Sequence, residues 1–181
     1  MIVKFSGKVV LVAGGTGGLG HAVSLAFLNE GAKVVVTYRN QKEFDTLRST
    51  AGPNGSSLEG RRVDVTDETA VRELIDAVFA KYGRLDGLVN TVGGYAGGVN
   101  LWETDPKLFD QMLTLNMRSG YVLARATVPA MLKQGFGAIV NIASKAAVEH
   151  AAGAAAYAAS KAGAVAIWIR LPPRSRAPEC G

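Results

Sequence analysis

Short, almost wholly apolar runs alternate with helix-like stretches along most of this chain. The runs lie at 9–13, 33–37, 60–63, 88–90 and 138–142, and the helical stretches lie at about 18–30, 41–50, 67–82, 106–134 and 154–170. The runs lack the polar alternation of a strand with one wet face, so they fit parallel strands covered on both faces. The pattern therefore predicts a three-layer α/β/α fold with a doubly wound parallel sheet of the Rossmann type.

Residues typical of helix ends support these boundaries. Gly31 and Gly135 stand where the first and fourth predicted helices should end, and glycine is the residue most common just past a helix. Asp67 and Glu68 begin the third helix, where the helix dipole favours negative charge.

The alternation stops near the end of the chain. Pro172 and Pro173 cannot continue a helix, so we expect one domain over residues 1–169 and an irregular basic tail over 170–181. The formal net charge is +5, but outside the tail basic and acidic residues are interspersed. A mixed solvated surface is therefore favoured over nucleic-acid binding. A weaker hypothesis is nucleic-acid binding through the tail, which requires steeply salt-dependent affinity that its removal abolishes.

The composition excludes several other classes of protein. An apolar share of 48% in 181 residues supplies a packed core, unlike a disordered chain. One cysteine, Cys180, and two histidines, His21 and His150, leave no disulfide and predict no metal site. The first residues lack the apolar core of a signal peptide, and no run is long enough to span a membrane. We therefore expect a cytoplasmic protein with no membrane partner.

Glycines cluster in segment 13–20, directly after the first predicted strand. Two dinucleotide-binding spacings fit them, G-x-G-x-x-G through Gly15, Gly17 and Gly20, and G-x-x-x-G-x-G through Gly14, Gly18 and Gly20. Such a turn lets the backbone approach a pyrophosphate, which then lies on the helix N-terminus. A flexible turn is the plainer reading, but the strand–turn–helix context favours dinucleotide binding.

The residues at the end of the second strand bear on which dinucleotide is bound. An acid there favours NAD because it reads the ribose hydroxyl. This chain has Tyr38 and Arg39 instead, with no acid before Glu43. A guanidinium can pair with a 2′-phosphate, so we expect NADP rather than NAD, unless Arg39 is an ordinary exposed turn residue.

Tyr157 and Lys161 share a helix face at i, i+4 spacing. A neighbouring ammonium favours the phenolate and lowers the pKa of a tyrosine, which makes it a usable acid–base group near neutrality. Spacing alone is weak evidence, because Tyr38 and Lys42 share it. Ser144, however, lies two residues after the fifth predicted strand and thirteen residues before Tyr157.

Taken together, these motifs resemble the classical short-chain dehydrogenase/reductase family over about residues 5–168. The family's T-G-x-x-x-G-x-G matches 13–20 with Ala13 in place of threonine, its N-N-A-G element matches 90–93 loosely, and its helix asparagine fits Asn116. Its catalytic Ser, Tyr and Lys fit Ser144, Tyr157 and Lys161. The resemblance implies an NADP-dependent oxidoreductase that interconverts a carbonyl and an alcohol.

The resemblance also implies the role of each matching residue. Tyr157 is the acid–base group, Ser144 hydrogen-bonds the reacting oxygen, Lys161 lowers the tyrosine pKa and holds the nicotinamide ribose, and Asn116 positions a water of the proton relay. The cofactor-binding residues it implies, together with those argued above, are Gly14, Thr16, Gly17, Gly18, Leu19, Gly20, Tyr38, Arg39, Asp64, Val65, Asn90, Gly93, Tyr157 and Lys161.

The resemblance has two further consequences. The family's helices at these positions form a dimer interface, so the apolar helix 106–134 predicts a homodimer or homotetramer; its apolar residues are Leu108, Met112, Leu115, Tyr121, Val122, Val128 and Met131. Tyr95 and Trp102 lie where the family contacts a small-molecule substrate, although they also fit ordinary loop anchors.

The sequence departs from the family after the Tyr–Lys helix. Family members continue with a sixth strand, a substrate lid and a seventh strand, where this chain has residues 170–181. We therefore expect the C-terminal strands of the family to be missing. The alternative function is a dinucleotide-binding module that does not catalyse and acts in interaction or sensing.

Overall fold

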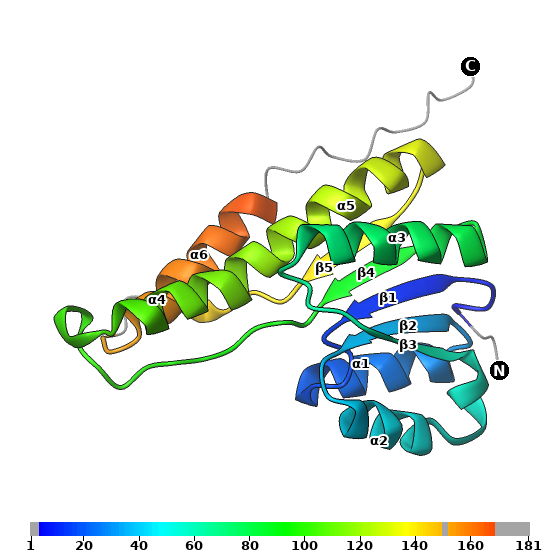
Figure 1. Cartoon of the computed structure of the whole chain (residues 1–181), viewed down its shortest axis with the longest axis horizontal. Coiled ribbons are helices and arrows are strands. Elements are labelled where there is room, and N and C mark those ends of the chain that lie inside the picture. Colours follow the sequence, from blue (N-terminus) through cyan, green and yellow to red (C-terminus); the bar gives the residue numbers. More distant parts are fainter. Residues whose placement is uncertain (1–3, 150–151, 169–181) are drawn as a thin grey trace.

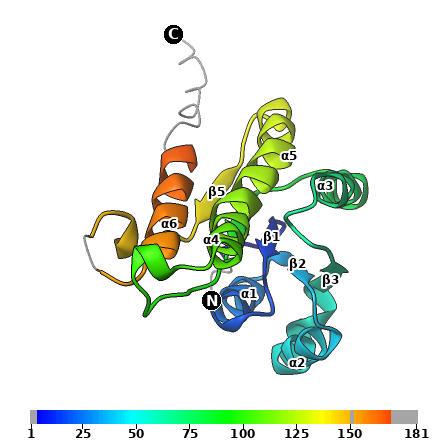
Figure 2. The same ribbon diagram turned by 60° about the vertical axis from the view of Figure 1, so that its left-hand side comes forward.

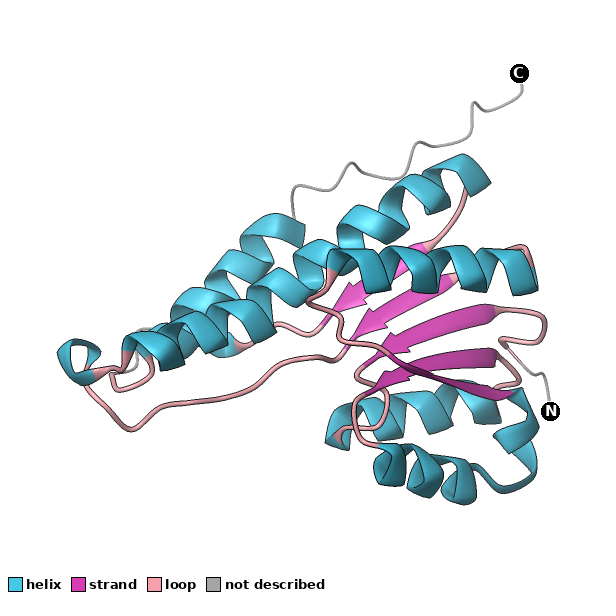
Figure 3. Cartoon of the chain, viewed as in Figure 1, coloured by secondary structure: helices cyan, strands magenta, loops and turns pink. Residues whose placement is uncertain are grey.

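The computed structural model describes residues 4–149 and 152–168. Its five strands form one parallel sheet in the order β3-β2-β1-β4-β5 (Figures 1 and 3). The strands are β1 (Val9–Ala13), β2 (Lys33–Tyr38), β3 (Leu58–Arg62), β4 (Gly87–Asn90) and β5 (Ala138–Asn141). Val10 pairs with Val34 of β2 on one side and with Gly87 of β4 on the other. The predicted doubly wound parallel sheet is confirmed.

Helices cover both faces of this sheet. They are α1 (Gly18–Asn29), α2 (Gln41–Ala51), α3 (Glu68–Tyr82), α4 (Pro106–Leu113), α5 (Ser119–Gln134) and α6 (Ala155–Trp168). In Figure 1, α1 and α2 lie below the strands and α3 and α5 lie above them. Figure 2 shows α6 beside α4 and α5, and α6 packs against α4. Short 3₁₀ turns η1 (Gly52–Ser57), η2 (Leu101–Glu103) and η4 (Lys145–Ala147) complete the order.

The packing of the central strand β1 explains why its five residues are all apolar. Val9 and Leu11 join the core cluster that includes α3 and α5 residues, while Val10 and Val12 join the cluster that includes α1 and α2 residues. All five residues of β1 are buried. Since successive side chains point to opposite faces, a strand with a helical layer on each side must be apolar throughout.

The predicted helix ends are confirmed in two places by backbone geometry. Asp67 caps α3, since its carboxylate accepts hydrogen bonds from the N–H groups of Thr69 and Ala70. Gly135 follows α5 with φ of 85°, a left-handed conformation that a side chain disfavours.

Two predicted elements differ in the structure. Strand β3 begins at Leu58 rather than at residue 60, because Leu58 pairs with Val34 and is buried. Polar residues obscured this strand: Glu59 is accommodated by a hydrogen bond from Tyr82 and ion pairs with Lys81 and Arg61.

The single helix predicted over 106–134 is divided by a π-helical turn, η3 (Thr114–Arg118). The extra residue of such a turn shifts the helical face. In this turn Asn116 is 2% exposed, so the division carries an amide side chain into the interior.

Some predicted features lie outside the described residues, and others can be compared with the described part of the chain. His150 and the tail at 170–181 lie outside the described residues. Over residues 4–149 and 152–168, no helix is long and apolar enough to cross a membrane. Within the same ranges, no group of three or more His, Cys, Asp or Glu side chains is arranged to hold a metal ion.

Candidate functional site

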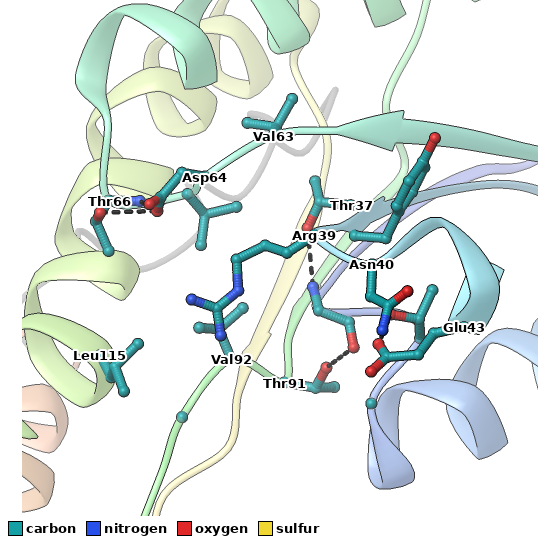
Figure 4. A pocket seen from close by; sticks show the side chains of 16 residues that line it. Thr37, Arg39, Asn40, Glu43, Val63, Asp64, Thr66, Thr91, Val92 and Leu115 are labelled. Carbon is teal, nitrogen blue, oxygen red and sulfur yellow. Dashed lines mark hydrogen bonds between the residues drawn. The ribbon is translucent and has the colours of Figure 1, made fainter.

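A cleft of about 320 Å³ opens at the carboxyl ends of β1, β2 and β4 (Figure 4). The chain runs outward from β1 to β2 and β3 and then returns to the other side of β1 at β4. Ligands of open α/β sheets bind at such a switch point. The cleft is lined by Gly14, Thr16, Gly17, Thr37, Tyr38, Arg39, Asn40, Glu43, Val63, Asp64, Val65, Thr66, Thr91, Val92, Gly93 and Leu115.

Two threonines anchor the glycine turn at the floor of the cleft. The Gly14 N–H donates to Thr37 Oγ1 over 2.9 Å, and Thr91 Oγ1 donates to the Ala13 carbonyl over 2.7 Å. Gly14 has φ of 73°, which explains a glycine there. At Gly20, a Cβ atom would lie 2.1 Å from the Gly14 carbonyl oxygen, so a side chain would force the turn and α1 apart.

The N-terminus of α1 has no side-chain cap. Its N-cap residue is Gly17, and its first turn contains no acidic residue. A Cβ atom at Gly18 would meet nothing within 4 Å. Since the first N–H groups of a helix lack intrahelical partners, this uncapped end and the positive end of its dipole are suited to a phosphate group.

Arg39 follows β2 directly and extends into the cleft. Its side chain is exposed, and Figure 4 shows the guanidinium on the Val92 side of the cleft. Hydrogen bonds from the Thr66 N–H and hydroxyl lower the pKa of Asp64, and the positive charge of Arg39 adds to this effect. The positive charge of Arg39 therefore acts on the carboxylate of Asp64, another residue that lines the cleft.

Glu43 is a cleft residue that the sequence analysis did not assign. It lies in the first turn of α2, and its Oε2 accepts a hydrogen bond from Thr16 Oγ1 over 3.0 Å. The sequence analysis considered only residues at the end of the second strand. Glu43 comes from the helix that follows this strand, and its side chain reaches the same edge of the sheet. An acid in the first turn of a helix that starts at this edge is the signal that could have found it.

The predicted cofactor-binding residues divide into two groups. Those that line the cleft are Gly14, Thr16, Gly17, Tyr38, Arg39, Asp64, Val65 and Gly93, and those that do not are Gly18, Leu19, Gly20, Asn90, Tyr157 and Lys161. Asn90 is buried, donates to Asn141 Oδ1 over 2.8 Å and accepts from the Val92 N–H. It therefore supports the turn after β4 from behind.

Lys161 does not line the cleft but lies in the interior, beside the cleft-lining Gly93. It is 6% exposed, and its Nζ donates to the Ile142 carbonyl oxygen over 2.9 Å. Burial lowers the pKa of its ammonium. A Cβ atom at Gly93 would lie 3.4 Å from Lys161 Nζ, so this cleft-lining glycine brings the backbone next to the ammonium.

Asn116 fixes the backbone of the same turn. Its Oδ1 accepts from the Gly94 N–H and its Nδ2 donates to the Gly94 carbonyl, each over 3.0 Å. Nδ2 also donates to Ser160 Oγ over 3.1 Å. The amide therefore links the π-helical turn, the loop after β4 and α6, next to Lys161.

Ser144 and Tyr157 lie on neighbouring elements. Ser144 Oγ caps η4 by accepting from the Ala146 N–H over 3.2 Å, and η4 packs along α6, which carries Tyr157. In the described part of the chain, no hydrogen bond joins the side chains of Ser144, Tyr157 and Lys161 directly to one another. The hydroxyl proton of Ser144 is free to point elsewhere, because the oxygen is the acceptor in its capping bond.

Tyr95 packs against Tyr157 from the long loop after β4. Their ring centroids are 5.0 Å apart at an interplanar angle of 77°. The Gly98 N–H donates to the Gly153 carbonyl oxygen over 2.7 Å, which ties this loop to the segment before α6. Tyr95 is 70% and Trp102 is 82% exposed. The Tyr95 ring therefore offers apolar surface beside Tyr157, and the Trp102 ring offers apolar surface farther along the same segment.

Known proteins resemble this chain over nearly its whole length. A family model described as short chain dehydrogenase matches residues 8–171. The 3-oxoacyl-[acyl-carrier-protein] reductase FabG of Thermotoga maritima is 33% identical over 90% of this chain and 66% of its own length. The D-threitol dehydrogenase of Mycolicibacterium smegmatis is 34% identical over 91% of this chain and 63% of its own. The chain spans about two thirds of the length of these relatives.

Solved structures resemble it to the same extent. A structure of ElxO with NADP bound has a TM-score of 0.84 at 31% identity and covers 88% of this chain and 64% of its own. A structure of NAD⁺-bound xylitol dehydrogenase has a TM-score of 0.85 at 30% identity, with 91% and 63% covered.

Proposed function

Since this chain belongs to the short-chain dehydrogenase family, we propose that it interconverts a carbonyl and an alcohol with a nicotinamide dinucleotide, NADP in preference to NAD. One observation carries the proposal. Gly93 lines the cleft, and a Cβ atom at this position would lie 3.4 Å from Lys161 Nζ. The cleft and the predicted catalytic group are therefore adjacent parts of one site.

The residues of the cleft fit the proposed cofactor. The uncapped α1 N-terminus at Gly17 suits the pyrophosphate, and Asp64 and Val65 line the wall suited to the adenosine part. When bound, the reduced cofactor would supply the hydride that the carbonyl carbon accepts, and the oxidised cofactor would accept the hydride of the alcohol in the reverse reaction. The protein itself has to bind, orient and handle the proton.

Arg39 supports the preference for NADP. It is a cation at the edge of the cleft, and a guanidinium can pair with the doubly charged phosphate that distinguishes NADP. The structures of relatives include one with NADP and one with NAD⁺, so the preference rests on Arg39.

Tyr157 acts as the acid in carbonyl reduction. Its hydroxyl gives its proton to the substrate oxygen as that oxygen gains charge, and in the reverse direction the phenolate takes the alcohol proton. The Ser144 hydroxyl donates a hydrogen bond to the same oxygen and stabilises the developing charge.

Lys161 and Asn116 support the tyrosine. The Lys161 ammonium favours the phenolate through its charge, while its hydrogen bond to the Ile142 carbonyl holds it in place. Asn116 keeps the turn at Gly94 fixed, and we assign to it the ordering of the water from which the tyrosine is reprotonated.

Turnover with a panel of small ketones and β-keto esters tests the proposal. We expect the absorbance of NADPH to fall only when both carbonyl compound and protein are present, and to fall more slowly with NADH. Binding of NADPH without turnover on any carbonyl would instead support the non-catalytic dinucleotide-binding module. Failure to bind either nicotinamide would contradict both.

A further inference from the structure

The cleft presents two opposite charges from different elements. Arg39 comes from the end of β2 and Glu43 from the first turn of α2, and both line the cleft. Figure 4 shows the Arg39 guanidinium on the Val92 side and the Glu43 carboxylate on the opposite side, near Asn40. Neither side chain forms an ion pair with any residue in the described ranges, so the two charges do not neutralise each other.

Glu43 differs from the other carboxylate of the cleft. Asp64 accepts hydrogen bonds from both the N–H and the hydroxyl of Thr66, and the charge of Arg39 lowers its pKa further. Glu43 accepts one hydrogen bond, from Thr16 Oγ1. Its negative charge is therefore the less compensated of the two.

The Thr16 hydroxyl fixes where that charge lies. Thr16 belongs to the glycine turn that opens α1, and its bond to Glu43 is 3.0 Å long. A carboxylate held there stands between the end of β2 and the α1 N-terminus, on the side where a dinucleotide's ribose phosphate would enter. A phosphate monoester adds about 1.5 to 2 negative charges at neutral pH, so the two groups repel each other.

We propose that Glu43 is a selectivity residue of the cofactor site, whose carboxylate opposes the ribose phosphate of NADP. The inference rests on the proposed function and adds to it. The preference between NADPH and NADH is then a balance in which Arg39 attracts the phosphate and Glu43 repels it. The wild-type preference for NADPH is weaker than Arg39 alone would give.

Cofactor titrations of Glu43→Gln test this directly, because the amide keeps the shape and a hydrogen-bond acceptor for Thr16. We expect the NADPH dissociation constant to fall about fivefold, which corresponds to about 1 kcal/mol, while that of NADH changes by less than about twofold. The gain should be larger at about 10 mM salt than at about 1 M, where the Debye length shrinks to roughly 3 Å.

Asp45→Asn is the matched control, since it removes the same charge from α2 at an exposed position outside the cleft. Its NADPH-to-NADH ratio should stay at the wild-type value. An unchanged ratio in Glu43→Gln, an equal change in Asp45→Asn, or weakened NADH with unchanged NADPH would overturn the inference while leaving nicotinamide binding intact. If neither protein binds either nicotinamide, the proposed function fails with it.

Discussion

In the proposed function, single side chains decide which cofactor is preferred and which group donates the proton. Their types could be read from the sequence, since Arg39, Tyr157 and Lys161 follow from motif spacing. Their surroundings could not. The burial of Lys161 depends on α6 packing against α4 and the π-helical turn, and the position of Glu43 depends on where α2 begins.

Arg39→Ala should weaken NADPH binding and leave NADH binding nearly unchanged. Loss of a charge-assisted hydrogen bond at an exposed site predicts about a tenfold rise in the NADPH dissociation constant. Fluorescence titration of both cofactors measures it, with Lys42→Ala as a control that removes a neighbouring positive charge outside the cleft lining. Equal affinities in the parent, or an unchanged preference in Arg39→Ala, would exclude Arg39 as the selector.

The pH dependence of carbonyl reduction should report Lys161. Burial lowers the pKa of its ammonium below the ordinary 10.5, so the positive charge is lost earlier as pH rises. We expect the rate to fall on the alkaline side through a pKa below 10.5, and Lys161→Ala to weaken both turnover and NADPH binding. A rate that stays flat up to that pH would argue that the ammonium charge is not needed.

The elements were predictable where one signal dominated. Four mainly apolar runs and a fifth, more polar run at 60–63 predicted five strands, because parallel strands that are covered on both faces are mostly apolar. Strand β3 was misplaced because Glu59 and Arg61 are polar residues in a strand at the edge of the sheet. The π-helical turn was missed because a continuous apolar pattern over 106–134 contains no residue that marks an inserted position.

Asp86 should stabilise the junction of β1 and β4. Its carboxylate accepts from the Val9 N–H over 2.9 Å and from Arg84 Nε over 2.8 Å, and it pairs with Lys8. Burial alone would raise its pKa, but the bonds from Arg84 and Val9 outweigh that effect, so the pKa of Asp86 is lowered. Asp86→Asn should lower the free energy of unfolding by about 1–3 kcal/mol at neutral pH.

The same substitution has a predicted pH signature. Because the folded-state pKa is below the ordinary 3.8, the unfolded chain binds the proton more readily. The stability difference between parent and Asp86→Asn should therefore be complete above about pH 4 and shrink as pH falls through the folded-state pKa. Urea unfolding at several pH values measures it, with exposed Asp76→Asn as control. A pH-independent difference would assign the effect to packing instead.

The sequence predicted the overall fold and the edge of the sheet that carries the cleft. The domain boundary at 169 stays a prediction, since residues 169–181 lie outside the described ranges. The apolar residues from which self-association was predicted are not all at the surface. Met112, Val122 and Met131 are buried within this chain's own fold, whereas Tyr121 is 39% exposed.

An open groove between α4, η3, α5 and α6 is the surface expected to meet a second copy. Leu113, Met117, Tyr121 and Ile167 contribute apolar surface to it. We predict at least a dimer by light scattering at tens of micromolar, and a shift toward monomer in Tyr121→Glu. Leu132→Glu is the control, on the same helix, 63% exposed and outside the groove. A monomeric mass for the parent would count against self-association through this groove.

The proposed function requires Tyr157 to be the proton donor of a nicotinamide-dependent carbonyl reduction, and the Tyr157→Phe variant tests this role. The change removes one oxygen and keeps the ring that packs on Tyr95, so folding and NADPH binding should be nearly unchanged. We predict that NADPH oxidation by a carbonyl substrate accepted by the parent falls by about 10²–10⁴-fold, as expected when a general acid is lost. A Tyr157→Phe protein that retains the parent's rate would show that the tyrosine is structural and would contradict the mechanism.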